Sequence, residues 1–210
     1  MKQTLFTFMA LAMAFAVTSC QSEEELPLEE LPQEPTNGTI GTAKATIDGK
    51  QVDVKWVQLW SGGPKFAEKN LGATSATGVG NTYQFSATGA NDKAATTWGD
   101  NWRTPSQGQM NELMKAATSG GSTKVKCQYI EEGGVFGFKF TGNGDYASNS
   151  VFFPAQSGYS FHGHAYYWSG SANGSKAWYM LLYNRYGNWF SDWNSDYQDN
   201  NYLVRPVLKN

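Results

Sequence analysis

The sequence predicts an α+β domain built mostly from short antiparallel strands and long loops, with one or two helices. Short apolar or alternating runs recur between clusters of Gly, Asn, Asp and Ser, a pattern typical of strands joined by turns. One amphipathic run, from Thr104 to Gly120, has helical spacing. The chain also contains 8 Trp, 11 Tyr and 12 Phe residues, which supply enough ring surface to fill the core of one domain.

Residues 1–19 predict a secretory signal peptide. A single lysine precedes an apolar run from Leu5 to Val17, which is too short for a stable membrane span. The small residues before Cys20 resemble a bacterial lipobox, so we expect Cys20 to be lipidated and to begin the mature protein. An ordinary signal peptide with an incidental cysteine is the alternative. The acidic segment Gln21–Glu25 resembles the export tag of Bacteroides-type surface lipoproteins, which implies the outer membrane, facing the cell exterior.

Residues 20–39 predict a flexible acidic tether. They hold six glutamates and three prolines but no aromatic side chain, so they cannot bury enough apolar surface to offset the entropy of ordering. Residues 40–210 then form a single domain with 12 acidic and 15 basic residues, a balance near +3. This charge is too small for a nucleic-acid footprint, so no nucleic-acid partner is expected.

Turn signals divide the domain into hairpins. Ala43–Ile47 and Gln51–Val54 flank an Asp-Gly pair, a favoured two-residue hairpin turn. Val125–Ile130 and Val135–Phe140 flank Glu131–Gly134 and predict a second hairpin, with alternate phenylalanines on one face. Further short strands are expected at residues 55–60, 65–71, 83–85, 151–153, 165–168, 177–183 and 202–208.

The helical run begins after a capping signal. Thr104 can cap the first free amide groups, Pro105 suits the first helical position, and Gln107 can return a hydrogen bond to the cap. Gly120 and Gly121 end the run. The apolar side chains that share one face of this helix, and that we expect to be buried, are Met110, Leu113, Met114 and Ala117.

Four short motifs of the domain resemble those of a known family. In chain order they are Asn70–Ala73, Asn101–Pro105, Tyr167–Gly170 and Val204–Val207. Their order and spacing are similar to the N-x-G-A, W-R-L-P-T, Y-W-S-S and V-R-P-V motifs of the Fibrobacter succinogenes major paralogous domain, which is common in surface lipoproteins of Bacteroides-like bacteria. This chain departs from that pattern at Thr104, where Leu is usual, and at Gly170, where a second Ser is usual. The resemblance covers about residues 45–208 and implies a C-type lectin-like fold whose chain ends share one sheet.

Cysteine and arginine residues have structural interpretations. With Cys20 lipidated, Cys127 is the only other cysteine, so the domain has no internal disulfide and depends on packing. Cys127 alternates with Val125 on an expected strand, and we interpret it as a buried apolar residue rather than a nucleophile. Arg103 and Arg205 lie beside prolines, and we expect both to be partly buried and to bond loop carbonyls. The alternative is that the two arginines bind an anion or a carboxylate.

The C-terminal part of the chain contains the candidate binding segment. Residues 184–201 mix Trp and Tyr with Asn, Asp and Gln between two expected strands, so the sequence predicts a long functional loop there. Aromatic rings can stack on the apolar face of a sugar while amides and carboxylates bind its hydroxyls. The alternative is that this loop packs on its own domain, with its rings in the core. The stacking candidates are Trp189, Trp193 and Tyr197, and the polar candidates are Asp192, Asn194 and Asp196.

Two patterns are weak metal signals, and no metal site is predicted. Asp192–Asp196 resembles the Trp-Asn-Asp motif of calcium-dependent lectins, but Ser195 is inserted and the partner motif is absent. His162 and His164 share one side of an expected strand; a two-histidine site needs a third ligand, so we expect these imidazoles to line the rim of the binding pocket. The acidic residues that would bind calcium, in the alternative to a metal-free module, are Asp192, Asp196 and Asp199.

These patterns predict a non-catalytic binding module without a cofactor. The chain lacks a Gly-x-Ser-x-Gly elbow, a phosphate-binding loop, a His-Glu-x-x-His helix and a pair of catalytic cysteines. We therefore expect a surface-exposed lipoprotein that recognises a glycan or a surface protein through residues 184–201. The alternative is a structural or accessory component of a surface fibre or complex. A carbohydrate-active enzyme using Asp192, Asp196 or Asp199 is the weaker interpretation, because the motifs are missing. It is retained because two carboxylates that are distant in sequence can form a hydrolase site.

Overall fold

The computed structural model describes residues 39–209 apart from 88, 90, 119–123 and 160–161, with the side chains of 157–159 and 162 also left undescribed. The described residues belong to one compact unit, Pro35–Asn210. The expected signal peptide, the lipidation residue Cys20 and all of the tether except Thr39 lie outside the described residues. Within the described ranges, no helix has the length and apolar character needed to cross a membrane.

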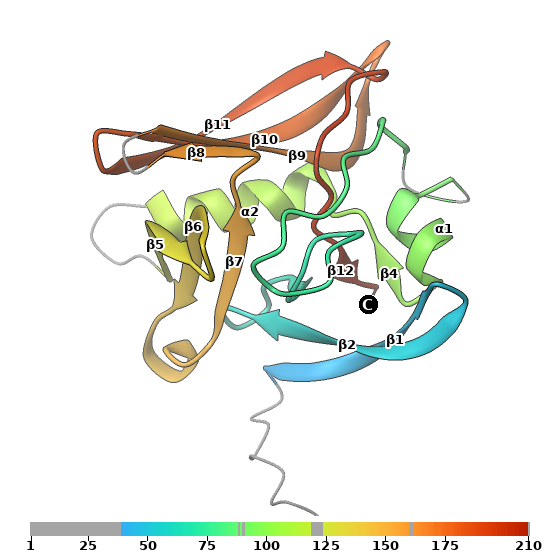
Figure 1. Cartoon of the computed structure of the whole chain (residues 1–210), viewed down its shortest axis with the longest axis horizontal. Coiled ribbons are helices and arrows are strands. Elements are labelled where there is room, and N and C mark those ends of the chain that lie inside the picture. Colours follow the sequence, from blue (N-terminus) through green and yellow to red (C-terminus); the bar gives the residue numbers. More distant parts are fainter. Residues whose placement is uncertain (1–38, 88, 90, 119–123, 160–161, 210) are drawn as a thin grey trace, which may run out of the picture. The chain divides into compact units, whose positions relative to one another are not determined.

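Antiparallel sheets dominate this unit and place it in the α+β class (Figure 1). One sheet has the order β1-β2-β3-β12-β4, the second β11-β10-β9-β8, and the third β5-β6-β7. The elements in chain order are β1 (Ile40–Ile47), β2 (Lys50–Gln58), β3 (Lys65–Ala67), α1 (Lys93–Trp98), β4 (Trp102–Arg103), α2 (Gln107–Thr118), β5 (Val125–Glu132), β6 (Val135–Gly142), a 3-10 turn (Gly144–Tyr146), β7 (Ser150–Pro154), β8 (Ser157–Tyr159), β9 (His162–Asn173), β10 (Lys176–Arg185), β11 (Asn188–Tyr197) and β12 (Val207–Leu208).

The five-stranded sheet starts with the predicted β1–β2 hairpin. Asp48 and Gly49 have positive φ angles of 52° and 74°, which suit the twist of a two-residue hairpin and confirm the predicted turn. The last strand, β12, pairs with β3 and β4, so the first and last strands of the described chain share one sheet. β3 ends at Ala67, so it is shorter than the strand predicted over residues 65–71. Tyr83, which was predicted to lie in a strand, forms only an isolated bridge to Tyr202.

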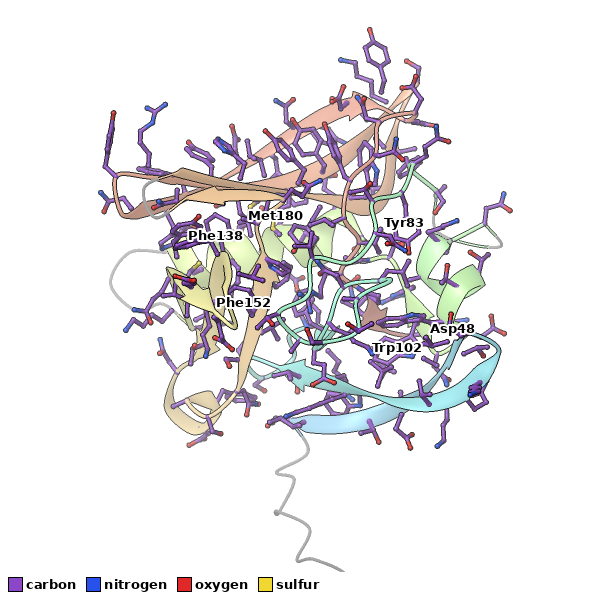
Figure 2. All side chains as sticks on the ribbon, in the orientation of Figure 1. Asp48, Tyr83, Trp102, Phe138, Phe152 and Met180 are labelled. Atoms are coloured by element: carbon purple, nitrogen blue, oxygen red, sulfur yellow. The ribbon has the colours of Figure 1, made fainter. Side chains whose placement is uncertain are left out.

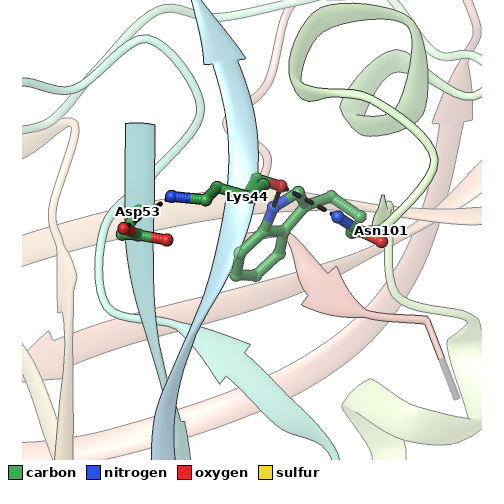
Figure 3. Close-up of polar contacts among 4 residues, drawn as sticks. Lys44, Asp53 and Asn101 are labelled. Carbon is green, nitrogen blue, oxygen red and sulfur yellow. Dashed lines mark hydrogen bonds and ion pairs between the residues drawn. The ribbon is translucent and has the colours of Figure 1, made fainter. Parts of the chain in front are cut away.

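The side chains of Asn101 and Trp102 hydrogen-bond the β4 end of this sheet to β1 at its other end. The backbone carbonyl of Lys44 in β1 accepts hydrogen bonds from the indole Nε1 of Trp102 at 3.0 Å and from the side-chain amide of Asn101 at 3.2 Å (Figure 3). Trp102 is fully buried and packs edge-on against Trp98 of α1. The Nζ of Lys44 also lies 2.8 Å from Asp53, but both side chains are more than half exposed, so this ion pair adds about 0.5 kcal/mol or less.

The β5–β6 hairpin of the three-stranded sheet is tighter than predicted. Its turn is Gly133–Gly134, with φ angles of 60° and 78° that glycine adopts without strain. Glu131 and Glu132 therefore belong to β5 and not to the turn, and Glu132 forms an ion pair of 2.8 Å with Lys139 of β6. The buried side chains of this sheet include Phe138, Phe140, Val151 and Phe153.

Helix α2 forms where the sequence predicts it, but its cap is different. The backbone N–H of Gln109 donates to the hydroxyl of Ser106, and the backbone N–H of Ser106 donates to the Gln109 side chain, so these residues form the capping box. The predicted cap, Thr104, is instead buried and donates its hydroxyl to Asp92. The predicted helix end at residues 120–121 lies outside the described residues. The predicted apolar face is confirmed, since Met110, Leu113, Met114 and Ala117 are all buried.

The sequence predicts one or two helices, and the second, α1, forms at a position that was not predicted. Asp92 caps it by accepting hydrogen bonds from the backbone N–H of Ala94 at 2.9 Å and of Ala95 at 3.2 Å. The same carboxylate accepts from the backbone N–H of Thr104 at 2.9 Å and from its hydroxyl at 3.0 Å. Asp92 is 2% exposed, so these donors replace the water that a buried carboxylate loses. One carboxylate therefore fixes α1 against the segment that leads into α2.

The four-stranded sheet contains the largest difference from the predicted structure. Residues 184–201 are not a long loop, because β10 and β11 pair along their whole lengths around a turn at Tyr186 and Gly187. Both turn residues have positive φ angles, 52° and 82°. The physical reason is a two-residue period in β11, where indoles and serines alternate with Phe, Asp and Asn. This alternation suits a strand that has one face on the core and one in solvent.

Two clusters of buried side chains fill the interior. In Figure 2, Met180 of β10 lies on the side of the four-stranded sheet that faces Phe138 of β6. Both residues share the first cluster with α2 and with Cys127, whose thiol pKa is raised well above its usual value by burial. Cys127 is therefore a buried apolar residue, as predicted, and its thiol stays protonated at neutral pH. The second cluster surrounds Trp102 and Trp168.

Arg205 joins the three sheets in the interior. Its guanidinium is fully buried, donates to the backbone carbonyls of Ala67 in β3 and Phe152 in β7, and lies 4.9 Å from the ring centroid of Phe153. It also interacts electrostatically with Tyr167 of β9. The prediction that Arg205 bonds backbone carbonyls is confirmed, but the side chain is fully rather than partly buried, and the carbonyls belong to strands rather than to loops. Burial lowers its pKa to about 10, which leaves the guanidinium charged at neutral pH.

Replacing Asp92 with alanine removes the α1 cap and both hydrogen bonds to Thr104. We expect the free energy of unfolding to fall by about 3 kcal/mol, because buried donors lose their acceptor. Urea denaturation followed by tryptophan fluorescence measures the change. Asp100→Ala, at an exposed aspartate, is the control and should change stability by less than about 0.5 kcal/mol. A loss below about 1 kcal/mol for Asp92→Ala would contradict the role given to this carboxylate.

Candidate functional site

Strands β9, β10 and β11 present one face to the first core cluster. Their other face is open to solvent near the β10–β11 turn and packs into the second cluster at Trp168 and Tyr179. Met180 and Leu182 of β10 are fully buried on the inner face, together with Ala165 and Tyr167 of β9. Helix α2 contacts this face, and Figure 1 shows it beneath the sheet. Because side chains alternate along a strand, the residues between these buried ones point to the outer face.

The two indoles predicted to stack on a ligand lie on the inner face. Trp189 and Trp193 are half-buried and pack against the first core cluster. The indole Nε1 of Trp193 donates to the Asn111 side chain of α2 at 3.2 Å, and the Trp189 ring lies edge-on to Phe140 at a centroid distance of 6.0 Å. The prediction that these rings stand in an exposed loop is wrong, because the two-residue period of β11 turns them toward α2 and the core.

A row of three rings crosses the outer face. The strand register places Tyr183 of β10 opposite His164 of β9 and opposite Phe190 of β11. The ring centroids are 6.3 Å apart between His164 and Tyr183, and 5.2 Å apart between Tyr183 and Phe190, with both pairs within 17° of parallel. His164 and Phe190 are exposed, whereas Tyr183 is half-buried. We call these three residues the ring row; it stabilises the strand pairing and remains accessible to solvent.

A second cross-strand row lies two residues along the strands from the ring row. It consists of Tyr166, Leu181 and Asp192, which the register places opposite one another. Asn194 follows on β11, opposite the buried ring of Tyr179. We call the surface that contains both rows the open face; its members are His164, Tyr166, Leu181, Tyr183, Phe190, Asp192 and Asn194.

Tyr202 covers the end of the outer face that starts at Tyr166, a member of the open face. Its ring packs against Tyr166, Trp168 and Tyr179, at centroid distances of 5.2, 4.5 and 4.9 Å. Its hydroxyl donates to the Asp196 carboxylate at 2.6 Å, and this hydrogen bond is the main cause that lowers the pKa of Asp196. Burial, together with the hydrogen bond and the charge of Asp196, raises the pKa of Tyr202. The pair is therefore an ionised acceptor and a protonated donor at neutral pH.

Three polar side chains of β11 bond to the backbone of their own strand. The side-chain oxygens of Asp192, Asn194 and Asp196 each accept a hydrogen bond from the backbone N–H of the next residue, at 2.7, 2.8 and 2.8 Å. Arg185 and Asn188 close the hairpin as a bonded pair, so Asn188 and every second residue after it bond to β10. The capped N–H groups therefore point to the free edge of the sheet. These edge caps occupy groups to which another strand would pair.

Some of the predicted site residues lie on the outer face, and other members of the open face were not predicted. Tyr197 is 59% exposed at the far end of β11, where the Nζ of Lys176 lies 4.9 Å from its ring centroid. His162 lies on β9 two residues before His164, but its side chain is outside the described part of the structure. The predicted site residues that share the outer face are His164, Asp192, Asn194 and Asp196. The members that the prediction missed are Tyr166, Leu181, Tyr183 and Phe190, and the two-residue alternation through residues 188–197 is the signal that would have found the last of them.

The acidic residues near β11 do not form a group suited to a metal ion. In the part of the chain that the structure describes, no three His, Cys, Asp or Glu side chains lie close enough together to hold one. The alternative calcium ligands Asp192, Asp196 and Asp199 are therefore not brought together. Asp196 instead bonds to Tyr202 and to its own strand.

Hollows elsewhere on the described surface combine charges of both signs. One of about 430 Å³ lies beside Trp60, with Glu112 and Lys115 of α2 on its lining. Another of about 490 Å³ lies beside Arg103 and Asp100. The Nε of Arg103 is buried and has no hydrogen-bond partner among the described residues, so its expected bond to a loop carbonyl is not seen for that atom. Charges of both signs line each hollow, so neither presents a surface of a single charge.

Comparison with known proteins identifies no matching family model, no matching curated protein and no matching solved structure. The residues of the open face are therefore the basis of the functional proposal.

Removing two of the edge caps should open β11 to pairing with other chains. We expect Asp192→Val with Asn194→Val to cause concentration-dependent association, because two edge N–H groups lose their acceptors and the strand becomes more apolar. Sedimentation velocity at several concentrations measures it. Asp53→Val with Lys55→Val adds two exposed valines to β2, which is not an edge strand, and should leave association unchanged. Equal behaviour of the two variants would contradict the capping role.

Replacing Tyr202 with phenylalanine removes the hydrogen bond that keeps the pKa of Asp196 low. We expect that pKa to rise toward its ordinary value of 3.8, as followed by NMR titration of the side-chain carboxyl. Because the folded pKa of this acid lies below its unfolded value, its contribution to stability is present above the unfolded pKa. It is lost as the pH falls through the folded pKa.

The stability difference between wild type and Tyr202→Phe should therefore be larger at about pH 7 than at about pH 2. Tyr197→Phe is the control, since Tyr197 contributes to Asp196 only through its backbone N–H. An Asp196 pKa that is the same in wild type and Tyr202→Phe would show that the hydrogen bond does not control this carboxyl.

Proposed function

We propose that this protein is a non-catalytic binding module that recognises a glycan through the open face. The observation that carries the proposal is the solvent-accessible ring row of His164, Tyr183 and Phe190, with Asp192 in the next row and Asn194 two residues beyond it on the same sheet face. We also propose that a lipid on Cys20 and an acidic tether hold the module on the outer membrane, facing the cell exterior.

A glycan suits this surface because it needs apolar and polar contacts side by side. The C–H groups of a pyranose pack on aromatic and aliphatic side chains, while its hydroxyls need fixed donors and acceptors. The ring row and Leu181 offer the first kind of contact, and Asp192 and Asn194 offer the second. The row crosses three strands, about 10 Å of sheet, which is long enough to contact more than one sugar unit.

The acidic groups of the outer face support a binding role more than a catalytic one. A glycoside hydrolase needs one carboxyl group with a raised pKa to protonate the leaving group. The pKa of Asp196 is lowered, and its carboxylate is held by Tyr202 and by the backbone of β11. The Asp192 carboxylate is likewise held by the N–H of Trp193.

For the fold, we propose a C-type lectin-like domain similar to the Fibrobacter succinogenes major paralogous domain. The shared sheet of β1 and β12 supports this, because that fold brings the chain ends together. The family-like motifs also meet in the interior. Asn70 donates to the hydroxyl of Tyr167 at 3.1 Å, and Arg205 lies close enough to Tyr167 to interact electrostatically.

A structural role in a surface fibre or complex is the second candidate function. The exposed large apolar side chains of the described residues are Tyr186, Phe190 and Tyr197, at 74, 42 and 59%, and all lie on the β10–β11 hairpin. Such a concentration is typical of a protein contact surface. Because the edge caps oppose strand addition, a protein partner is expected to lie on the open face rather than along the edge of β11.

The double variant Tyr183→Ala with Phe190→Ala tests the proposed function. We expect it to lose at least about tenfold of the glycan affinity of the full chain, because truncating two contact rings removes more than about 1.4 kcal/mol. A glycan array followed by titration calorimetry on the best ligand measures the change. Tyr186→Asn is the matched control, since it replaces an exposed ring in the turn and Asn tolerates the positive φ there.

Equal glycan profiles for the wild type and the folded double variant would exclude the open face as the glycan site. A stoichiometric surface protein that co-purifies with the wild type and is lost with the same variant would favour the second candidate function.

A further inference from the structure

The edge caps fix the side chains of Asp192 and Asn194 as well as protecting β11. A backbone N–H can only donate, so the atom of each side chain that faces it must be an oxygen. In Asn194 this oxygen is Oδ1, bonded to the N–H of Ser195 at 2.8 Å, and the amide Nδ2 is therefore directed away from it as a donor. In Asp192, Oδ1 bonds to the N–H of Trp193 at 2.7 Å, and Oδ2 remains as an acceptor.

These two free groups lie two residues apart on one face of one strand, about 7 Å along it. Neither Oδ2 of Asp192 nor Nδ2 of Asn194 has a hydrogen-bond partner among the described residues. Both side chains are exposed; Asp192 lies opposite Leu181 in the row next to the ring row, and Asn194 lies opposite Tyr179, about 13 Å along β11 from Phe190. A ligand on the rings thus meets one fixed acceptor and one fixed donor, whose rotamers are already ordered before binding.

The charge differs between the two sides of the ring row. Asp192 lies on one side, and Asp196 lies beyond it on the same strand face with a pKa lowered mainly by Tyr202 and in part by the charge of Lys176. Arg185 lies on the other side of the ring row, two residues along β10 from Tyr183 and about 13 Å along the strand from Asp192. The end of the open face that holds Asp192 and Asn194 is therefore the end where a ligand meets a carboxylate and no adjacent cation among the described residues.

From this arrangement, and resting on the proposed function, we infer that the Asp192–Asn194 end of the open face prefers a sugar unit that is uncharged or carries an amine. Asp192 accepts a hydrogen bond from one ligand hydroxyl or ammonium group, and Asn194 donates one to a ligand oxygen. A carboxylated or sulfated unit at this end binds more weakly, because its anionic group meets the Asp192 carboxylate. Asp192 and Asn194 are thus the specificity-determining residues of the face. The ring row supplies an apolar contact that does not depend on which sugar is bound.

Two isosteric substitutions separate this role from edge capping. Asn194→Asp and Asp192→Asn each keep a side-chain oxygen that can accept from the next backbone N–H, so the fold and the closed edge are preserved. Asn194→Asp removes the donor, and Asp192→Asn offers an amide in place of the charge. We expect each to weaken binding of uncharged oligosaccharides by about tenfold, because one ligand hydrogen bond is lost or replaced.

The probes are printed panels of four kinds, presented to the full chain: uncharged xylo- and manno-oligosaccharides, chitosan oligosaccharides, oligogalacturonates and heparin fragments. We expect tighter binding to the first two panels than to the last two. Asp192→Asn should also weaken the chitosan signal more than the uncharged signal, because it removes the charge that attracts an ammonium group. Far-UV circular dichroism and sedimentation velocity check that each variant is folded and no more associated than wild type.

The outcomes distinguish this inference from the proposed function. If Tyr183→Ala with Phe190→Ala abolishes binding while both isosteric variants bind like wild type, the selectivity assigned to Asp192 and Asn194 is wrong and the glycan site stands. Tighter binding to oligogalacturonates or heparin than to the uncharged panel overturns the inference in the same way. Binding that survives the double ring variant, or the absence of binding to all four panels, overturns both.

Discussion

The buried guanidinium of Arg205 is the contact on which the arrangement of the three sheets depends. It donates to carbonyls of β3 and β7 and interacts with Tyr167 of β9, so each sheet supplies part of its environment. A cation removed from water is stable only where fixed dipoles replace the lost hydration. Moving one sheet relative to the others would leave this charge without partners. The position of the four-stranded sheet, and with it the orientation of the open face, is therefore tied to a single interior group.

A second constraint acts on the outermost hairpin. β11 must bury Trp189 and Trp193 against α2 and Phe140, and the strict alternation of a strand then forces Phe190, Asp192 and Asn194 outward. The same geometry exposes every second N–H of β11 along the free edge, and the polar side chains close it. Packing, exposure and edge protection thus follow from one two-residue period, and the binding surface is a consequence of how the hairpin is held.

Local signals predicted the parts of the fold that depend on neighbouring residues. The Asp48-Gly49 turn and the apolar face of α2 form as predicted, because turn geometry and helical spacing are set within a few residues. The cap of α2 was assigned to Thr104 rather than Ser106, since both residues can cap and only the burial of Asp92 draws Thr104 away. The β10–β11 hairpin was missed because its turn, Tyr186-Gly187, lacks the usual Asn or Asp, and its aromatic content favoured a loop interpretation.

By itself the sequence determined the α+β class, the positions of most strands and of the long helix, and the region of the chain that supplies the candidate site. His164, Asp192 and Asn194 were named from it, because residue chemistry and spacing are local properties. Only the tertiary structure decided that these residues join Tyr166, Leu181, Tyr183 and Phe190 on one face while both indoles turn inward. The reason is that the side of a strand that faces solvent depends on what packs against its other side. The elements that pack against β11, α2 and β6, are distant from it in the sequence.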